Sequence, residues 1–178
     1  AIDSIAESNR RLKALGKSVR LHLSLGGKFF GAEEEREFRS RLDCDDLALD
    51  LDFGPEQTRA AEHFGFVAGE EKANLYQACA ATLFPTFYES EGMPVWMVEA
   101  HAYGQQIITT RWRAIPSIVD GSAVFLTDPG DVSALAAACI GAITADGFQQ
   151  NRNQFLDRFT LNAHLNKMQQ VYENLATI

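Results

Sequence analysis

The stretch ATLFPTFYESEGMPVWMVEAHAYGQQIITT, residues 81–110, decides the fold class. Two short apolar runs, 81–86 and 105–110, enclose an almost wholly apolar segment that begins at Pro94. Short apolar strands without alternation are typical of parallel sheets, because helices cover both faces of such sheets. We therefore interpret this stretch as a strand, a loop, a helix and a second strand.

The same order of strands and helices continues on both sides of this stretch. Further strands are predicted at 19–25, 47–53 (near a sheet edge) and 123–129, and helices at 1–16, 32–42, 64–80 (after a turn) and 132–143. The pattern of the last thirty residues predicts one more helix, or two. The positions expected to be buried there are Phe155, Phe159, Leu165, Met168, Val171, Tyr172 and Leu175. Strands that alternate with helices predict an α/β fold with a doubly wound, Rossmann-like parallel sheet. Such sheets bind ligands beyond the carboxyl ends of their strands, so the loops of interest are 26–28, 65–67, 89–94 and 109–116.

Composition narrows the class of protein. The chain has 178 residues, 46% of them hydrophobic, which is enough for one domain with a real core. Its net charge of −8 argues against partners with phosphate backbones, such as nucleic acids, and against anionic membranes. The one dense charge run, residues 31–41, alternates in sign at helical spacing and predicts a solvated helix.

The cysteines and the chain start bear on the setting of the protein. Cys44, Cys79 and Cys139 stand alone, so neither a disulfide framework nor a zinc site is indicated and a reduced, cytoplasmic setting is expected. No signal peptide and no apolar run of membrane-spanning length is present. Because the sequence opens directly into a helical pattern without an initiator Met, we expect it to be a fragment of a longer protein.

The loop before Pro94 has the features of an anion site. Pro94 fits the first position of a helix, where its missing N–H costs nothing. The amides of Gly92 and Met93 would then lie beside the positive end of the helix dipole, and Gly92 lets a ligand approach the backbone closely. Glu91 would project into the same space.

Glu99 is the unexpected residue of the helix itself, which has no polar stripe. An ionised carboxylate there needs partners or water. Periodicity leaves two readings open: Glu99 either points to water or pairs with an Arg, or it faces a ligand cleft. His101 and Tyr103 are interpreted as packing or rim residues rather than catalysts.

The segment ESEGMPVWMVEAHAYGQQIITT resembles the motif of the retaining family 4 (group 1) glycosyltransferases, in which two glutamates enclose seven residues. Three further blocks of this chain resemble blocks of the same family and occur in the family's order. They are FGFVAGEEKANLYQACAATLFPT, QQIITTRWRAIPSIVDGSAVFLTDPGD and DRFTLNAHLNKMQQVYENL. The resemblance covers most of the chain from about Val19 onward.

The resemblance implies a fold, a donor and a set of site residues. It implies the C-terminal, donor-binding half of an enzyme with two Rossmann-like domains (GT-B), and transfer of a sugar from a nucleotide-sugar with retained anomeric configuration and no bound metal or other cofactor. Glu99 matches the glutamate that binds the ribose hydroxyls, and Glu91 matches the one that faces the donor sugar. The other matched positions line the donor: Gly92, Met93 and Pro94 beside sugar and phosphate, and Phe66 and Val67 beside the nucleobase.

The family pattern also implies what this sequence lacks. The family's diphosphate-binding Arg and Lys, and the strand that precedes them, lie upstream of Ala1, so we expect a gap in the middle of the sheet and an N-terminal acceptor domain as partner. A gap of this kind could favour pairing between two copies of the chain. Glu89 is a rival to Glu91, although the spacing to Glu99 favours Glu91. The alternatives are a related sugar-nucleotide epimerase or phosphorylase, and a degenerate member that only binds a partner.

Overall fold

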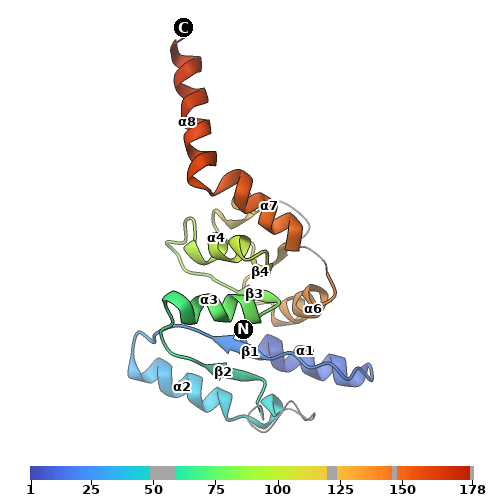
Figure 1. The fold of residues 1–178 in the computed structure, drawn as a ribbon. Coiled ribbons are helices and arrows are strands. Elements are labelled where there is room, and N and C mark those ends of the chain that lie inside the picture. Colours follow the sequence, from blue (N-terminus) through green and yellow to red (C-terminus); the bar gives the residue numbers. More distant parts are fainter. Residues whose placement is uncertain (49–58, 120–123, 146–147, 177–178) are drawn as a thin grey trace.

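The structure, a computed structural model, describes residues 1–48, 59–119, 124–145 and 148–176. Helices and strands alternate along most of the chain (Figure 1). The helices are α1 (Ile2–Ala14), α2 (Ala32–Leu42), the 3₁₀ helix η1 (Asp45–Leu47), α3 (Gly69–Ala78), α4 (Val95–Ala102), α5 (Ile115–Ile118), α6 (Val132–Ala142), α7 (Phe148–Arg158) and α8 (Leu161–Ala176). The strands are β1 (Leu23–Leu25), β2 (Ala61–His63), β3 (Ala81–Phe84), β4 (Gln106–Thr110) and β5 (Val124–Thr127).

Every strand pair within these elements is parallel, which confirms the predicted fold class. The strands form two sheets, β1-β2 and β3-β4-β5. Both sheets nevertheless contribute to one hydrophobic core, which contains Leu23 and Ala61 from the first sheet and Ile108 from the second. The gap in the sheet that the family pattern implies, and the strand that would fill it, stay predictions.

Two hydrophobic cores lie on the two faces of the central strand β4. Ile108 packs into a core with Ile5 of α1 and Leu135 of α6. Its neighbour Ile107 points the other way, into a core with Met97 of α4. Because successive side chains of a strand alternate between faces, β4 is buried along its whole length and helices cover both faces of the sheet.

Several predicted boundaries were wrong. The strand predicted at 19–25 is ordered as a strand only over Leu23–Leu25. At 47–53, Leu47 ends the 3₁₀ helix η1 and Ala48 forms an isolated antiparallel bridge with Arg59, while residues 49–53 lie outside the described part of the chain. The strand β2 was missed, because its three residues, AEH, carry no alternation that would distinguish them from a loop.

The predicted helices fared better than the strands. α1 ends at Ala14 and Gly16 follows with φ +67°, the left-handed conformation that glycine tolerates after a helix. Asp131 caps α6 by accepting a hydrogen bond from the Ala134 amide at 2.8 Å. The charged helix α2 has no buried residue, as predicted for a solvated helix, and carries an ion pair between Arg39 and Glu35.

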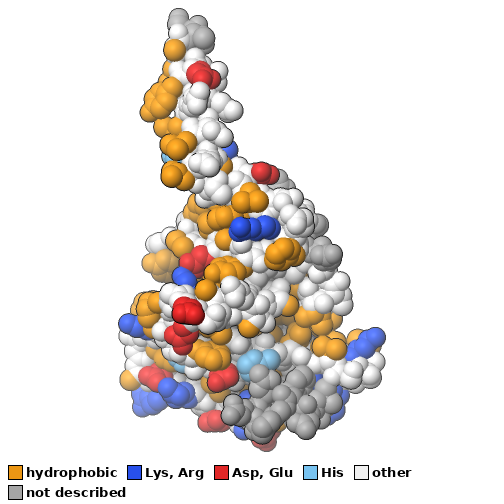
Figure 2. Space-filling view, viewed as in Figure 1, with side chains coloured by type: hydrophobic (Ala, Val, Ile, Leu, Met, Phe, Trp, Pro, Cys, Tyr) orange, Lys and Arg blue, Asp and Glu red, His pale blue; other side chains and the backbone are white. Residues whose placement is uncertain are grey.

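The C-terminal region contains two helices, and the second one departs from the prediction. α8 extends away from the rest of the molecule (Figure 1). Hydrophobic side chains lie along one side of this helix (Figure 2). The positions on it that were predicted to be buried are instead exposed: Leu165, Met168, Val171, Tyr172 and Leu175. Phe155 and Phe159, which lie nearer the core, are only partly buried. The amphipathic pattern of α8 is real, but no other described element covers it.

Candidate functional site

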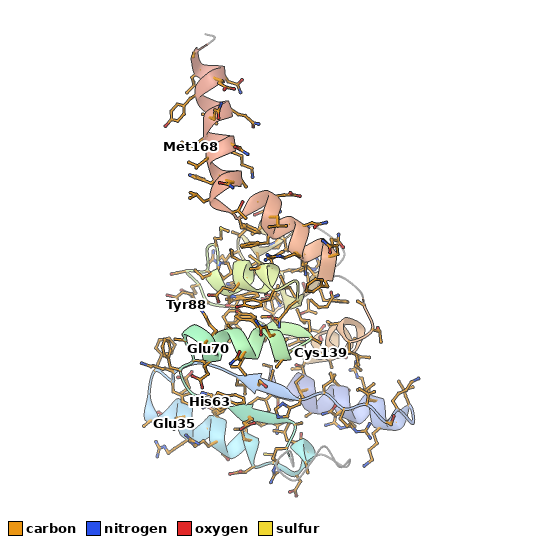
Figure 3. The ribbon with its side chains drawn as sticks, in the orientation of Figure 1. Glu35, His63, Glu70, Tyr88, Cys139 and Met168 are labelled. Atoms are coloured by element: carbon orange, nitrogen blue, oxygen red, sulfur yellow. The ribbon has the colours of Figure 1, made fainter. Side chains whose placement is uncertain are left out.

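The loops that follow the strands gather on one side of the molecule. Figure 3 shows His63, Glu70 and Tyr88 on this side. They come from the end of β2, the first turn of α3 and the loop after β3. The indole N–H of Trp112, which follows β4, donates a hydrogen bond to the Tyr88 carbonyl at 2.8 Å. This hydrogen bond ties the loops after two neighbouring strands together, at the end of the sheet where α/β folds bind ligands.

Glu91 is fixed at the carboxyl end of β3. Its Oε2 accepts a hydrogen bond from the hydroxyl of buried Thr86 at 3.0 Å, and its amide donates to the Tyr88 carbonyl at 3.1 Å. The carboxylate is therefore half-buried and oriented. Glu89, the rival residue, is exposed in the same loop and makes no ion pair or hydrogen bond within the described residues. This difference favours Glu91 as the oriented carboxylate.

The start of α4 differs by one residue from the prediction. Pro94 has an extended backbone, with φ −73° and ψ 128°, and caps the helix, which begins at Val95. Pro94 is therefore the N-cap rather than the first helical residue. Gly92 and Met93 are exposed on the loop just before it. The first amides of α4 still point toward this loop, as at any helix N-terminus.

Glu99 lies in the middle of α4 and is bound by two side chains of α3. The Lys72 ammonium nitrogen lies 2.5 Å from Glu99 Oε1. The Tyr76 hydroxyl donates a hydrogen bond to Glu99 Oε2 at 3.2 Å. The Glu99 side chain keeps 28% of its surface exposed. The sequence left two readings open: Glu99 points to water or pairs with an Arg, or it faces a ligand cleft. The structure shows a pairing, with a Lys in place of an Arg. The part of the carboxylate that stays exposed leaves room for a ligand.

Tyr76 is held in its hydrogen-donating form. Burial, followed by the nearby Glu99 carboxylate, raises the pKa of Tyr76 well above its ordinary value. Its ring stacks on Tyr103 with centroids 5.0 Å apart and planes 6° from parallel. Neither Lys72 nor Tyr76 was predicted from the sequence as a partner of Glu99. The signal available was their spacing of four residues, which puts both on one side of α3.

Phe66 and Val67 form the turn just before α3 and lie against the loop 26–28. The Gly27 amide donates to the Gly65 carbonyl at 2.7 Å. A Cβ on Gly26 would lie 2.7 Å from Val67 Cγ2, so only glycine fits there without movement. The Phe66 ring is 65% exposed, and the Lys28 ammonium lies 4.7 Å from its centroid. The turn therefore presents an accessible aromatic face beside a positive charge.

The structure links some of the predicted residues more closely than others. α3 connects the Phe66–Val67 turn to Glu99, because it begins two residues after Val67 and carries Lys72. Glu91 is attached separately, through Thr86, to the end of β3. No hydrogen bond or ion pair joins Glu91 directly to Glu99 within the described residues.

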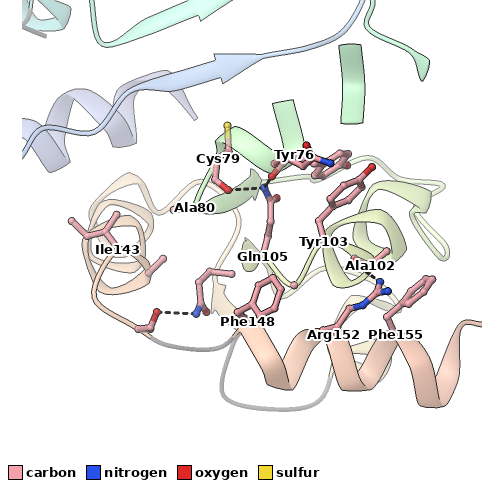
Figure 4. A pocket seen from close by; sticks show the side chains of 15 residues that line it. Tyr76, Cys79, Ala80, Ala102, Tyr103, Gln105, Ile143, Phe148, Arg152 and Phe155 are labelled. Atoms are coloured by element: carbon pink, nitrogen blue, oxygen red, sulfur yellow. Dashed lines mark hydrogen bonds between the residues drawn. The ribbon is translucent and has the colours of Figure 1, made fainter. Parts of the chain in front are cut away.

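A cavity of about 780 Å³ lies at the amino ends of β3 and β4, where Tyr76, the partner of Glu99, and Tyr103 form part of its wall (Figure 4). Cys79 and Gln105, which precede these strands, line it together with Phe148 and Arg152 of α7. None of the seven predicted site residues lines this cavity. Parallel sheets bind ligands at the opposite end, so we do not place the candidate site there.

The described residues lack two features that would indicate other kinds of site, a metal centre and a membrane-spanning helix. They contain no group of three or more His, Cys, Asp and Glu side chains that could hold a metal ion. Within the same residues, no helix combines the length and the apolar character needed to cross a membrane. Cys44, Cys79 and Cys139 are all free, in agreement with their isolated positions in the sequence.

Comparison with known proteins decides the family. Residues 9–145, most of the chain, match the family model described as "Glycosyl transferases group 1". The chain belongs to the group 1 glycosyltransferase family. The "O-antigen chain mannosyltransferase B" of Escherichia coli is 30% identical over 88 residues, which cover 49% of this chain and 22% of that protein.

The solved structures similar to this group 1 chain share its fold. Sucrose-phosphate synthase from Thermosynechococcus elongatus superposes with a TM-score of 0.65 at 21% identity, over 99% of this chain and 42% of that one. Anabaena HepE, in complex with UDP and glucose, superposes with a TM-score of 0.68 at 20% identity, over 99% of this chain and 44% of that one. The chain thus spans less than half the length of these structures and is similar to their Rossmann-like, GT-B fold.

Proposed function

We propose that this chain is the donor-binding domain of a glycosyltransferase that moves a sugar from a nucleotide-sugar to an acceptor with retained anomeric configuration. The proposal rests on how Glu99 is held in this member of the group 1 family. Its partly open carboxylate is fixed by Lys72 and Tyr76 of the helix that follows the Phe66–Val67 turn. In this proposal Glu99 binds the ribose hydroxyls, while Phe66 and Val67 lie beside the base.

The reacting end of the donor is assigned to the loop before α4. Glu91 faces the donor sugar, and the backbone of Gly92, Met93 and Pro94 lies beside the sugar and the phosphates. The bond between the sugar and the diphosphate breaks through a transition state with oxocarbenium character. Catalysis then rests on positioning and on stabilising the departing diphosphate, to which the positive end of the α4 dipole contributes. No metal ion takes part in this scheme.

The acceptor and the partners belong to the same proposal. The similarity to a protein named O-antigen chain mannosyltransferase supports a glycan acceptor and a role in polysaccharide synthesis. The chain spans less than half of its solved relatives. We therefore propose an N-terminal acceptor-binding domain as its partner. Size-exclusion chromatography with light scattering tests whether the chain also pairs with a second copy.

The test is a transfer assay on the full-length protein. Sugar nucleotides of uridine, guanosine and adenosine are supplied with candidate oligosaccharide acceptors, and the anomeric configuration of the product is read by NMR. We expect retention, and we expect Glu99→Gln to reduce turnover at low donor concentration. Glu37→Gln, an exposed glutamate on α2, serves as the matched control. A product with inverted configuration, or full activity of Glu99→Gln, would overturn the assignment.

A further inference from the structure

Lys72 and Tyr76 form a two-point support for the Glu99 carboxylate. The two side chains are one helical turn apart on α3, and each binds a different oxygen of Glu99. Tyr76 is itself fixed by its stack on Tyr103 and by a 3.4 Å hydrogen bond from its hydroxyl to the Trp96 carbonyl. The orientation of Glu99 is therefore set by α3 rather than by its own helix.

The ion pair has little to contribute to folding. The Lys72 side chain is 40% exposed and the Glu99 side chain 28% exposed, and ion pairs open to solvent stabilise proteins only weakly. The pair joins α3 to α4, and these two helices flank the loops of the candidate site. Its main physical effect is local, because it restricts where the Glu99 carboxylate can point.

The supported carboxylate still has capacity for a ligand. An ionised carboxylate offers about four lone-pair sites, of which Lys72 and Tyr76 take one on each oxygen. About two acceptor sites remain. Two neighbouring hydroxyl groups, such as the 2′ and 3′ hydroxyls of a ribose, supply two donors at matching separation. A carboxylate that two partners already orient therefore suits a vicinal diol without first having to be ordered.

The charges around Glu99 also indicate a role for Lys72 in nucleotide binding. The loop before α4 carries Glu89 and Glu91, and α3 begins with Glu70 and Glu71, so an anionic nucleotide meets an acidic surface. The Lys72 ammonium compensates the negative charge of Glu99 at the point where the nucleotide would bind. Loss of this ammonium would leave Glu99 both less oriented and uncompensated.

We infer that Lys72 is a positioning residue for nucleotide recognition, which holds Glu99 in the orientation that accepts the two ribose hydroxyls. The inference rests on the proposed function, because it takes Glu99 as the ribose ligand. It adds a requirement that the family motif does not contain, namely a cation on α3. Lys72 contacts Glu99 and acts on the nucleotide through it.

The test compares a nucleotide with its dideoxy analogue on the full-length protein. UDP, GDP and ADP are first titrated by calorimetry to find the one that binds, and its 2′,3′-dideoxy analogue is titrated next. We expect the wild type to bind the ribonucleotide about tenfold or more tightly than the analogue, because hydrogen bonds to a charged group are lost. In Lys72→Met this ratio should fall to within about threefold, and Lys72→Arg should restore most of it.

The control variants distinguish the positioning role of Lys72 from the proposed role of Glu99 as the ribose ligand. Lys17→Met removes an exposed lysine beyond the far end of α1 and should leave the ratio unchanged. A Lys72→Met protein that keeps the full wild-type ratio would overturn the positioning role while leaving the role of Glu99 intact. A wild type that shows no preference for the ribonucleotide would overturn both. If Lys72→Met does not fold, Lys72→Gln replaces it, with the same two readings.

Discussion

The Thr86 hydroxyl donates a hydrogen bond to Glu91 Oε2 at 3.0 Å and so fixes the carboxylate at the carboxyl end of β3. Thr86 is buried, and its own carbonyl accepts a hydrogen bond from the Thr110 hydroxyl of the neighbouring strand β4. Glu91 is thus connected to two strands of the sheet through one buried residue. The carboxylate assigned to the donor sugar has a rigid support, whereas Glu89 in the same loop has none among the described residues.

This support leads to a prediction for turnover. If Glu91 faces the reacting sugar, Glu91→Gln should lower kcat by about a hundredfold, because a charge placed for the transition state is lost. The KM for the donor should change by no more than about threefold, since ribose and base contacts remain. Steady-state kinetics with varied donor measures both. Glu89→Gln is the matched control and should stay within about threefold of the wild type; a large loss in Glu89→Gln with an active Glu91→Gln would reverse the two roles.

The contact between Gly26 and Val67 predicts an effect on nucleotide binding. Gly26→Ala would place a Cβ 2.7 Å from Val67 Cγ2, so Val67 of the Phe66–Val67 turn has to move. We expect nucleotide affinity to fall about tenfold, because a small displacement of a binding group is costly. The second substitution Val67→Ala in the same protein should recover most of the loss by removing the clash. Calorimetric titration of both variants and of Val67→Ala alone checks this; no loss in Gly26→Ala would show that the turn does not contact the nucleotide.

Buried His101 predicts how stability depends on pH. It is fully buried, its ring nitrogens lie 2.7 Å from the Met97 carbonyl and 3.1 Å from Gln154 Oε1, and burial lowers its pKa. The unfolded chain therefore binds a proton near pH 6.5, while the folded chain does so only at lower pH. The free energy of unfolding should decrease as the pH falls from 7.5 to 5.5, since protons then favour the unfolded state.

Urea unfolding at several pH values measures this dependence. His101→Gln, which has no titrating group, should show a smaller loss of stability over the same interval. Burial also lowers the pKa of His22, so part of the dependence should remain. Equal slopes for the wild type and His101→Gln would show that His101 does not contribute.

Much of the fold could be predicted because its signals are local. The continuous apolar runs of β3 and β4, the left-handed Gly16 after α1 and the Asp131 cap of α6 each depend on a few neighbouring residues. β2 was missed because a three-residue strand is defined by its pairing with β1 and not by its own pattern. The apolar side of α8 was correctly read as one face of a helix, but whether such a face is covered depends on packing that periodicity does not contain.

In the candidate site, too, local features could be predicted from the sequence and long-range contacts could not. Glu91 and Glu99 could be selected because their spacing matches the motif of the family, whereas periodicity alone left Glu99 open between solvent and a cleft. The partner of Glu99 could not, because Lys72 is 27 residues away and meets it only when α3 packs beside α4. The hydrogen bond between Thr86 and Glu91 could not be predicted either. The two residues are five positions apart, and whether they meet depends on the conformation of the loop between them.

The central claim is that Glu99 binds the ribose of a nucleotide donor, and one measurement tests it most directly. UDP, GDP and ADP are titrated by calorimetry into the full-length protein and into Glu99→Gln, with Glu37→Gln as the control. We predict that at least one nucleotide binds to the wild type and to Glu37→Gln, and that its affinity for Glu99→Gln is lower by about ten- to a hundredfold. Equal affinity for the wild type and Glu99→Gln, or no binding of any of the three nucleotides, would contradict the account.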